Sequence, residues 1–280
     1  MILVAGATGT IGRELVLELK SRRAPVRALT RDPERARLRI GPVDFAVGSV
    51  ARPETVARAL EGARAAFLLS PDDPDALSWE TAFVRAARAA GVERLVLVSE
   101  LGAALDAPFA AGRRRAEAEE ELARSGPKFA ILRPALLYQN LFAASLTGGT
   151  LAAPLGTARF ALVDARDVAA AAAAALLDGA GEGAATVLTG PAALSGAEIA
   201  AVLSEALGRR ISYRDLPPEL ARRALLEAGL PAWRADALLE RAAFLRSGRA
   251  DLGGDGVRAL SGREPIPLAR FARDYAARLA

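Results

Sequence analysis

The chain opens with Met1-Ile2-Leu3-Val4-Ala5-Gly6-Ala7-Thr8-Gly9-Thr10-Ile11-Gly12, and this stretch decides the fold. Residues 2–5 read as a buried β-strand, and residues 11–20 place apolar side chains on one face of a helix. Between them, glycines three residues apart permit a tight turn and let a pyrophosphate approach the main chain at the helix N-terminus. A strand, a glycine-rich turn and a helix in this order predict a dinucleotide site, with an ordinary tight turn as the alternative.

The loop residues expected to contact the dinucleotide are Gly6, Thr8, Gly9, Thr10, Ile11 and Gly12. About 20 residues further on, an NAD-binding protein usually carries an acid for the ribose 2′-hydroxyl. Here the second predicted strand ends in Thr30-Arg31, and Asp32 comes only afterwards. A guanidinium suits a 2′-phosphate through paired hydrogen bonds, so we expect NADP(H) in preference to NAD(H). The alternative is that Arg31 is a solvated surface residue in an arginine-rich chain.

Short apolar strands then alternate with longer helical segments. The expected strands are 26–30, 43–47, 65–69, 95–98 and 129–132, and the expected helices are 53–60, 75–90 and 112–124. This alternation predicts an α/β fold with a doubly wound (Rossmann) parallel sheet. We expect residues 1–135 to form the dinucleotide-binding core, with 158–190 returning to it. Residues 136–280 then form a smaller, mostly helical lobe.

Composition excludes several classes of function. The 280 residues contain no cysteine and no histidine, so disulfides, the usual zinc ligands, a thiolate nucleophile and a histidine-based triad are absent, and we expect no metal. The net charge of +4 comes from scattered arginines, interleaved with acids, so nucleic-acid binding is not expected. The N-terminus does not resemble a signal peptide, and no apolar run is long enough to span a membrane. We therefore expect a cytoplasmic protein.

Five sequence blocks resemble the NmrA-like branch of the atypical short-chain dehydrogenase/reductase superfamily, and more narrowly its NAD(P)H:quinone oxidoreductase and azoreductase members. They are the glycine loop, residues 90–99 (AGVERLVLVS), Leu132-Arg133-Pro134 with Gln139-Asn140-Leu141, residues 163–169 (VDARDVA), and Leu188-Thr189-Gly190-Pro191 followed by the expected capping box of Ser195 with Glu198. The stretch Ala228-Gly229-Leu230-Pro231 extends the resemblance, which covers nearly the whole chain. It implies a Rossmann fold, a bound NAD(P)H and a small-molecule acceptor.

The chain departs from the superfamily pattern in its acid residues. Classical members use a Tyr-x-x-x-Lys pair, but none of the three tyrosines (Tyr138, Tyr213 and Tyr275) has a lysine four residues later. Close relatives often carry His, Lys or Tyr on the helix after the fifth strand, where this chain has Arg115. An arginine stays charged, so it can hold a phosphate or ribose or stabilise an anion, but it is a poor proton donor.

Quinones, azo compounds and iminium ions do not need that acid, because hydride uptake gives them a stabilised anion or a neutral amine. We therefore expect a reductase that transfers a hydride from NADPH to such an acceptor. A non-catalytic NADP(H)-binding redox sensor or scaffold is the alternative from another class, and a dedicated biosynthetic reductase or isomerase is a third. The sequence leaves the oligomeric state open, with a homodimer as one option.

Several residues near the expected strand ends are candidates for the remaining contacts. For the cofactor they are Leu69, Ser70, Ser99 and Pro134; for catalysis, Ser99, Arg115 and Tyr138; and for the acceptor, Tyr138, Asn140 and Trp233. Each has a structural alternative. Ser99 can cap the next segment, and Pro134 can simply end its strand. Tyr138 and Asn140 can serve packing, and Trp233 can belong to a core or an interface.

Overall fold

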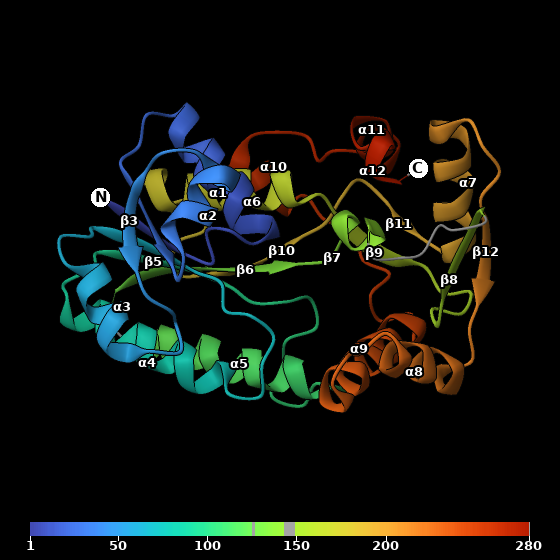
Figure 1. The fold of residues 1–280 in the computed structure, drawn as a ribbon, viewed down its shortest axis with the longest axis horizontal. Helices are drawn as coiled ribbons and strands as arrows, with labels where there is room; N and C mark the ends of the chain where they lie inside the picture. The colour runs from blue at the N-terminus through green and yellow to red at the C-terminus, as the bar shows by residue number, and fades with distance from the viewer. Residues whose placement is uncertain (125–126, 143–148, 280) are drawn as a thin grey trace.

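The first strand and helix form where the sequence predicts them, as β1 (Ile2–Ala5) and α1 (Thr10–Ser21) (Figure 1). The computed structural model describes residues 1–124, 127–142 and 149–279. Within these ranges β1 belongs to a seven-stranded sheet with the order β10-β6-β5-β4-β1-β2-β3, in which every pairing is parallel. Its other strands are β2 (Val26–Thr30), β3 (Asp44–Val47), β4 (Ala65–Leu68), β5 (Arg94–Val98), β6 (Lys128–Pro134) and β10 (Ala185–Leu188).

Helices cover both faces of this sheet (Figure 1). One face carries α1, α6 (Ala165–Asp178) and α10 (Gly256–Ser261), and the other carries α3 (Pro53–Leu60), α4 (Ala76–Ala89) and α5 (Ala110–Arg124). Successive strand residues point to opposite faces, so Val96 and Val98 join one hydrophobic cluster while Leu95 and Leu97 join the other. The expected doubly wound Rossmann fold is confirmed. Its strand order reverses between β1 and β4, which is where such sheets bind ligands.

The sequence prediction missed a short helix: it ended the second strand at Thr30, took Arg31-Asp32-Pro33 as the close of that strand, and placed no helix after it. The structure has α2 (Pro33–Ile40) there. The Asp32 carboxylate caps it by accepting a hydrogen bond of 2.9 Å from the Arg35 N–H, and Pro33 occupies its first turn. Both are ordinary helix-start signals, and the high arginine content of α2 obscured its apolar face.

The chain beyond β6 builds smaller units around the end of the sheet. Among the described residues, β7 (Leu136–Leu137), β9 (Phe160–Val163) and β11 (Ala193–Leu194) form a three-stranded sheet, and β8 (Thr150–Ala153) pairs with β12 (Ser212–Asp215). The helical elements are η1 (Tyr138–Phe142), α7 (Gly196–Leu207), α8 (Pro218–Glu227), α9 (Ala232–Arg246), α11 (Leu268–Asp274) and α12 (Ala276–Leu279). The expected Ser195–Glu198 capping box opens α7. The domain boundary near residue 135 stays a prediction, although β10 does return to the main sheet.

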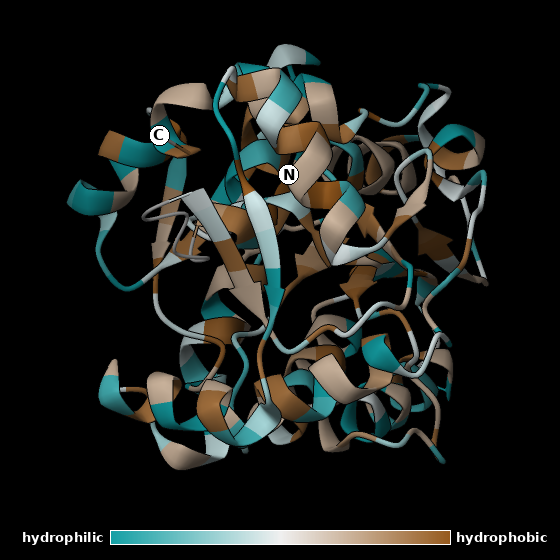
Figure 2. Ribbon diagram, turned by 90° about the vertical axis from the view of Figure 1, so that its right-hand side faces the viewer, coloured by the Kyte–Doolittle hydropathy of each residue, from teal (hydrophilic) through white to brown (hydrophobic). Residues whose placement is uncertain are grey.

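The core is dominated by small and branched apolar side chains. Hydrophobic residues fill the central strands, while hydrophilic residues mark the outer helices (Figure 2). Every alanine from Ala169 to Ala175 in α6 is buried, so this helix packs closely against both the sheet and α1. No helix within the described residues is both long and apolar enough to cross a bilayer.

Candidate cofactor and acceptor site

The glycine loop lies at the switch point, tightly folded between β1 and α1. The Gly9 N–H donates to the Gly6 carbonyl over 3.0 Å. Gly6 has φ +83°, and a Cβ there would lie 2.6 Å from the carbonyl oxygen of Leu69, just beyond β4. A Cβ on Gly12 would overlap the Gly6 carbonyl oxygen. Only glycine fits both positions, and the loop backbone stays open to a ligand.

Helix α1 leaves its N-terminus available for that ligand. Gly9 is the N-cap and supplies no side-chain cap, and the first turn carries no acidic residue. The first N–H groups of a helix lack partners within it and carry the positive end of its dipole. Phosphate binding in such a cradle requires a main chain that the phosphate can approach closely and N–H groups that no side chain blocks, and both are present. The residues therefore fit the pyrophosphate of a dinucleotide.

A groove of about 470 Å³ adjoins this cradle. Thr8, Gly9 and Thr10 line one side of it, and Gln139, Ala165 and Tyr275 are among the residues lining the other. Three arginines also line it: Arg13 from α1, Arg39 from α2 and Arg278 from α12. The Arg39 guanidinium donates to the Thr8 carbonyl over 3.3 Å. The sequence reading did not single out these arginines; recognising α2 would have drawn attention to Arg39.

Arg31 is exposed directly after β2. The neighbouring Asp32 side chain is occupied as the cap of α2, so its Oδ1 already accepts from a backbone N–H. The acid that follows this strand therefore has a structural role, whereas Arg31 beside it is exposed.

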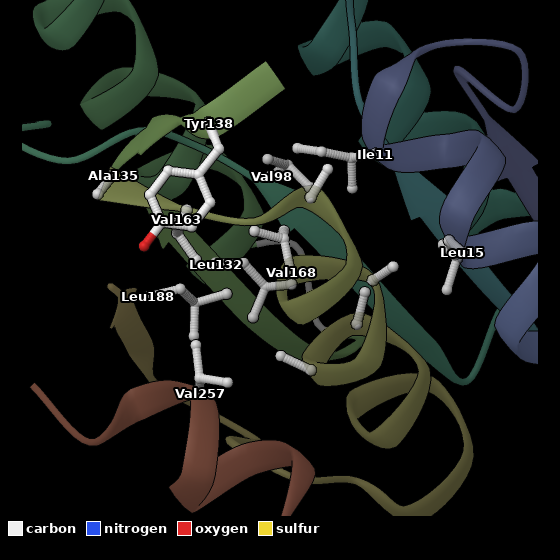
Figure 3. Packing of buried hydrophobic residues seen from close by; sticks show 14 of the residues in the cluster. Ile11, Leu15, Val98, Leu132, Ala135, Tyr138, Val163, Val168, Leu188 and Val257 are labelled. Atoms are coloured by element: carbon white, nitrogen blue, oxygen red, sulfur yellow. The ribbon is translucent and has the colours of Figure 1, made fainter. Parts of the chain in front are cut away.

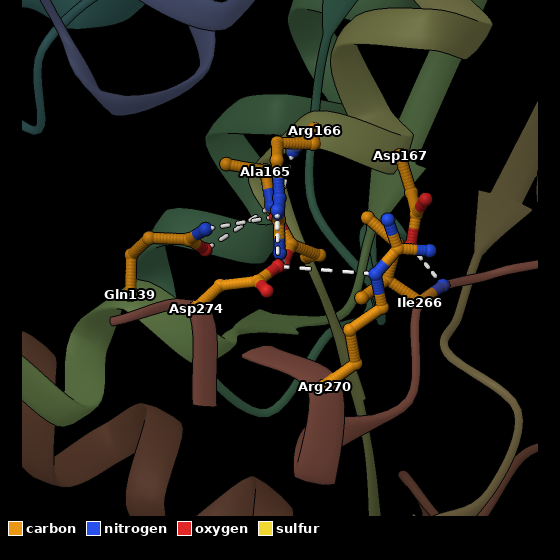
Figure 4. Close-up of polar contacts among 8 residues, drawn as sticks. Gln139, Ala165, Arg166, Asp167, Ile266, Arg270 and Asp274 are labelled. Carbon is orange, nitrogen blue, oxygen red and sulfur yellow. Dashed lines mark hydrogen bonds and ion pairs between the residues drawn. The ribbon is translucent and has the colours of Figure 1, made fainter. Parts of the chain in front are cut away.

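The far wall of the groove rests on a polar network at the start of α6 (Figure 4). Asp164 is fully buried and accepts from Gln139 Nε2 over 2.9 Å, while the Gln139 Oε1 accepts from the Ala165 N–H over 3.1 Å. Asp167 Oδ2 accepts from the Ile266 N–H over 2.8 Å. Burial raises the pKa of Asp167 to about 6, with nearby Asp164 acting in the same direction. This network fixes η1 and α6 relative to the C-terminal segment.

On the other side of the switch point, beyond the end of β4, the candidate site contains buried charges. Ser70, two residues beyond β4, donates from its Oγ to the Glu80 carboxylate of α4. Arg115 of α5 donates from Nη1 to Ser70 Oγ over 3.2 Å and also to Glu80. All three residues are at most 8% exposed. Burial raises the pKa of Glu80, although Arg115 and the Ser70 hydrogen bond act against that rise.

Ser99 and Pro134 lie at the ends of the next two strands. Ser99 is 5% exposed, and its Oγ has no hydrogen-bond partner among the described residues. Its N–H donates to the Leu132 carbonyl over 2.8 Å. Pro134 is the last residue of β6 and is buried. A buried hydroxyl without a partner is uncommon and suggests that a ligand completes its hydrogen bonding.

The structure separates the remaining candidates. Tyr138 is 1% exposed and packs among core residues near Leu132 and Val163 (Figure 3), with its ring centroid 5.4 Å from that of Phe271. Burial raises the pKa of its hydroxyl. This placement favours packing over a catalytic or acceptor role. Asn140 is exposed in η1, and Trp233 is 39% exposed near the start of α9.

Helix α9 is tied to the loops at this end of the sheet. Arg241 donates to both oxygens of Asp72 over 2.9 Å and to Glu100 over 2.7 Å. Burial alone would lower the pKa of Arg241, but Glu100 and Asp72 raise it. Glu240 accepts from the Ala110 N–H at the start of α5. Helix α9 is thus held against the loops that follow β4 and β5 and against the start of α5.

Glu80 was missed by the sequence reading, although it has a sequence signal. It falls on the buried stripe of α4 with Ala76, Phe83 and Ala87. An acid in an apolar stripe predicts a buried, paired charge. Its partner could not be identified from the stripe alone.

Comparison with known proteins agrees with this geometry. A family described as NAD(P)H-binding matches residues 6–179. The chain is 38% identical to an NAD(P)H azoreductase from Xenophilus azovorans, covering 99% of this chain and 98% of that protein. The NADPH-dependent quinone oxidoreductase from Escherichia coli has a similar structure, with a TM-score of 0.85 and 26% identity over 99% of this chain and 100% of that one.

The fold also resembles that of NmrA, a negative transcriptional regulator solved in complex with NADP, with a TM-score of 0.79. The identity is 19%, over 98% of this chain and 94% of NmrA, so this likeness concerns the fold alone. The match to the family model and the full-length similarity to the azoreductase carry the assignment. The chain belongs to the NAD(P)H-binding family, and over its full length it is similar to an oxidoreductase that acts with NAD(P)H.

Proposed function

We propose that the protein is an NADPH-dependent reductase that transfers a hydride to a quinone or a related conjugated acceptor, such as an azo compound or an imine. The observation that carries this proposal is the glycine cradle at the switch point, where Gly6 and Gly12 leave no room for a side chain. The names of the similar azoreductase and quinone oxidoreductase support the choice of acceptor.

We propose NADP(H) rather than NAD(H) as the cofactor. Arg31 is exposed at the end of β2, and Asp32 is engaged as a helix cap. The three groove arginines add positive charge near the loop. A 2′-phosphate gains from paired guanidinium contacts, whereas a 2′-hydroxyl calls for a free acid.

When bound, a reduced nicotinamide supplies the hydride. Thr8, Thr10 and the N–H groups at the start of α1 would hold the phosphates, and Leu69, Ser70 and Pro134 would border the nicotinamide end. Ser99 and Arg115 are the proposed catalytic residues, and Asn140 and Trp233 remain proposed acceptor contacts. Enclosure of this end by α9 would exclude water from the acceptor. The final proton comes from solvent, because the chain has no Tyr-x-x-x-Lys pair.

The test is NADPH oxidation, followed by absorbance, against quinones, azo dyes and cyclic imines, with NADH in parallel. Turnover with one acceptor class, faster with NADPH, is the expected result. Gly12→Ala is the matched negative variant, since its added Cβ overlaps the Gly6 carbonyl oxygen. Equal rates with NADH and NADPH would contradict the proposed cofactor preference. Absence of turnover with every acceptor would contradict the proposal that the protein is a reductase.

A redox sensor that binds NADP(H) without turnover is the second candidate. Two observations favour it. The chain lacks the Tyr-x-x-x-Lys pair, and Arg115, which stands where close relatives often carry a proton donor, is buried in an ion pair with Glu80. Tight NADPH binding with no turnover on the whole panel would favour it.

A cytoplasmic location and a homodimer are further proposals, checked by cell fractionation and by size-exclusion chromatography with light scattering.

A further inference from the structure

A buried polar layer lies between the α4–α5 pair and the carboxyl ends of three neighbouring strands. From the helices come Glu80, Arg115 and Glu119, and from the strand ends come Ser70, Ser99 and Arg133. The Arg133 Nε donates to Glu119 over 2.9 Å. Arg115 and Glu119 are four residues apart, so one face of α5 presents both charges to the sheet.

Strand register puts the three strand-end residues at one level. Leu68 pairs with Leu97 and Val98 pairs with Leu132, so continuing each register aligns Ser70 with Ser99 and Ser99 with Arg133. Leu97 and Ile131 both join the cluster under α4 and α5. Alternation therefore directs Ser99 and Arg133 to the same side, and the Arg133–Glu119 pair agrees with this.

Two groups in this layer have unused hydrogen-bonding capacity. Among the described residues Arg115 uses only Nη1, for Ser70 and Glu80, so Nε and Nη2 make no hydrogen bond there. The Oγ of Ser99 has no partner either. A guanidinium offers five N–H donors in a fixed plane, and a buried unsatisfied hydroxyl costs about 1–3 kcal/mol. A ligand that accepts hydrogen bonds from both would satisfy this end of the site.

We propose that Arg115 and the Ser99 hydroxyl form an anion-binding subsite for the acceptor, and that Glu80 and Ser70 are positioning residues that hold Arg115. This inference rests on the proposed function and narrows its substrate class. The acceptor takes a hydride, with its electron pair, from the reduced nicotinamide, which is oxidised in the same step. The electron pair ends on an oxygen or nitrogen anion beside Arg115, and water then supplies the proton to that anion.

The layer selects acceptors by the basicity of the anion they form. A permanently charged guanidinium can stabilise a phenolate-type anion but cannot protonate an alkoxide. Quinones give such phenolates, whereas simple aldehydes and ketones give strongly basic alkoxides. We therefore expect turnover of quinones and of acceptors with similarly stabilised anions, and no turnover of simple carbonyl compounds.

The first test measures kcat for a series of substituted quinones whose hydroquinones differ in acidity. Arg115→Met should lower kcat by about 100-fold or more, the usual effect of removing a donor to a developing anion, and should steepen the dependence on hydroquinone pKa. Glu80→Gln should lower kcat less, because Arg115 remains but is held less firmly. Arg114→Met, on the same helix, is the matched control and should match the wild type.

The second test is a binding experiment that needs no turnover. With NADP⁺ present, titration calorimetry compares 4-nitrophenolate, a mimic of the reduced acceptor, with the neutral 4-nitroanisole. The wild type should prefer the phenolate by about tenfold or more, as one lost charge-assisted hydrogen bond implies. Arg115→Met should lose the preference while NADPH binding, followed by fluorescence, changes by less than about threefold.

Ser99→Ala covers the case in which Arg115→Met does not fold. Removing an unpartnered buried hydroxyl should keep or raise the melting temperature while weakening phenolate binding and kcat. A merely structural Ser99 would leave both unchanged. If quinone turnover is present but unaffected by Arg115→Met and Ser99→Ala, the subsite is overturned and the reductase stands. If NADPH binds and no acceptor reacts, the reductase itself is overturned.

Discussion

The candidate site has two ends, one at the glycine loop after β1 and one beyond β4 and β5, and they are built by different means. At the end of β1 the site is made of backbone: glycines at positions 6, 9 and 12, an uncapped helix start and a nearby carbonyl. Beyond β4 and β5 it is made of buried side chains from α4 and α5, with Arg115 joined to Glu80 and Ser70. The first end recognises a phosphate shared by many ligands. The second end carries charges that depend on one another, so we expect it to be more sensitive to single substitutions.

The largest expected effect tests that sensitivity directly. Glu80→Ala leaves Arg115 buried without its counterion, so the free energy of unfolding should fall by about 3–5 kcal/mol. Urea denaturation measures it. Glu93→Ala, which removes an exposed partner of Arg64, is the control and should lower the free energy of unfolding far less, because solvent screens that pair. Equal losses in the two variants would contradict the buried pair.

The second prediction concerns Asp167, under the far wall of the glycine end. Its pKa is about 6 in the folded protein against 3.8 for the free side chain, so folding is favoured while the carboxyl is protonated. That contribution is complete below about pH 4 and is lost as the pH rises through 6, amounting to roughly 3 kcal/mol. Asp167→Asn still offers an oxygen to the Ile266 N–H and should be more stable than the wild type above pH 6.

The pH profile of the melting temperature checks this prediction. The two proteins should have equal stability near pH 4 and diverge toward pH 7, in favour of the variant. A wild type that gains on the variant with rising pH would reverse the sign and refute the raised pKa. Glu198→Gln offers a contrast, because the backbone and hydroxyl hydrogen bonds of Ser195 lower the pKa of Glu198. The wild-type protein should therefore gain stability relative to Glu198→Gln as the pH rises and Glu198 ionises.

The third prediction addresses the backbone end. Gly12→Ala forces the loop apart, which should cost about 1–3 kcal/mol and abolish NADPH binding in a fluorescence titration. Gly253→Ala meets nothing within 4 Å and is the control, with a change within about 0.5 kcal/mol. Retained NADPH affinity in Gly12→Ala would mean that the cradle lies elsewhere.

The smallest expected effect is on cofactor choice. Arg31→Ala should weaken NADPH binding by about tenfold, the equivalent of one charged hydrogen bond, and leave NADH binding unchanged. The ratio of the two dissociation constants is the measurement. If the ratio stays fixed, Arg39→Ala is the next variant, because Arg39 reaches the glycine loop at Thr8.

The sequence predicts the first end of the site better than the second. A glycine pattern between a strand and a helix is local, so residues 2–21 indicate the cradle without knowledge of any other segment. The pairing of Glu80 with Arg115 joins two helices, and neither residue reveals its partner in the sequence. Tyr138 shows the same limit, since a tyrosine after β6 can face a ligand or, as here, pack in the core.

The helix α6 has a consequence for how this site can evolve. Its run of buried alanines lets α6 lie close to α1, and these two helices begin at opposite walls of the groove. A larger residue at a position of this run that faces α1 would push the two helices apart, because a close-packed interior has no spare volume. The width of the ligand groove is therefore set from inside the core, and substitutions that never touch a ligand can change which ligands fit.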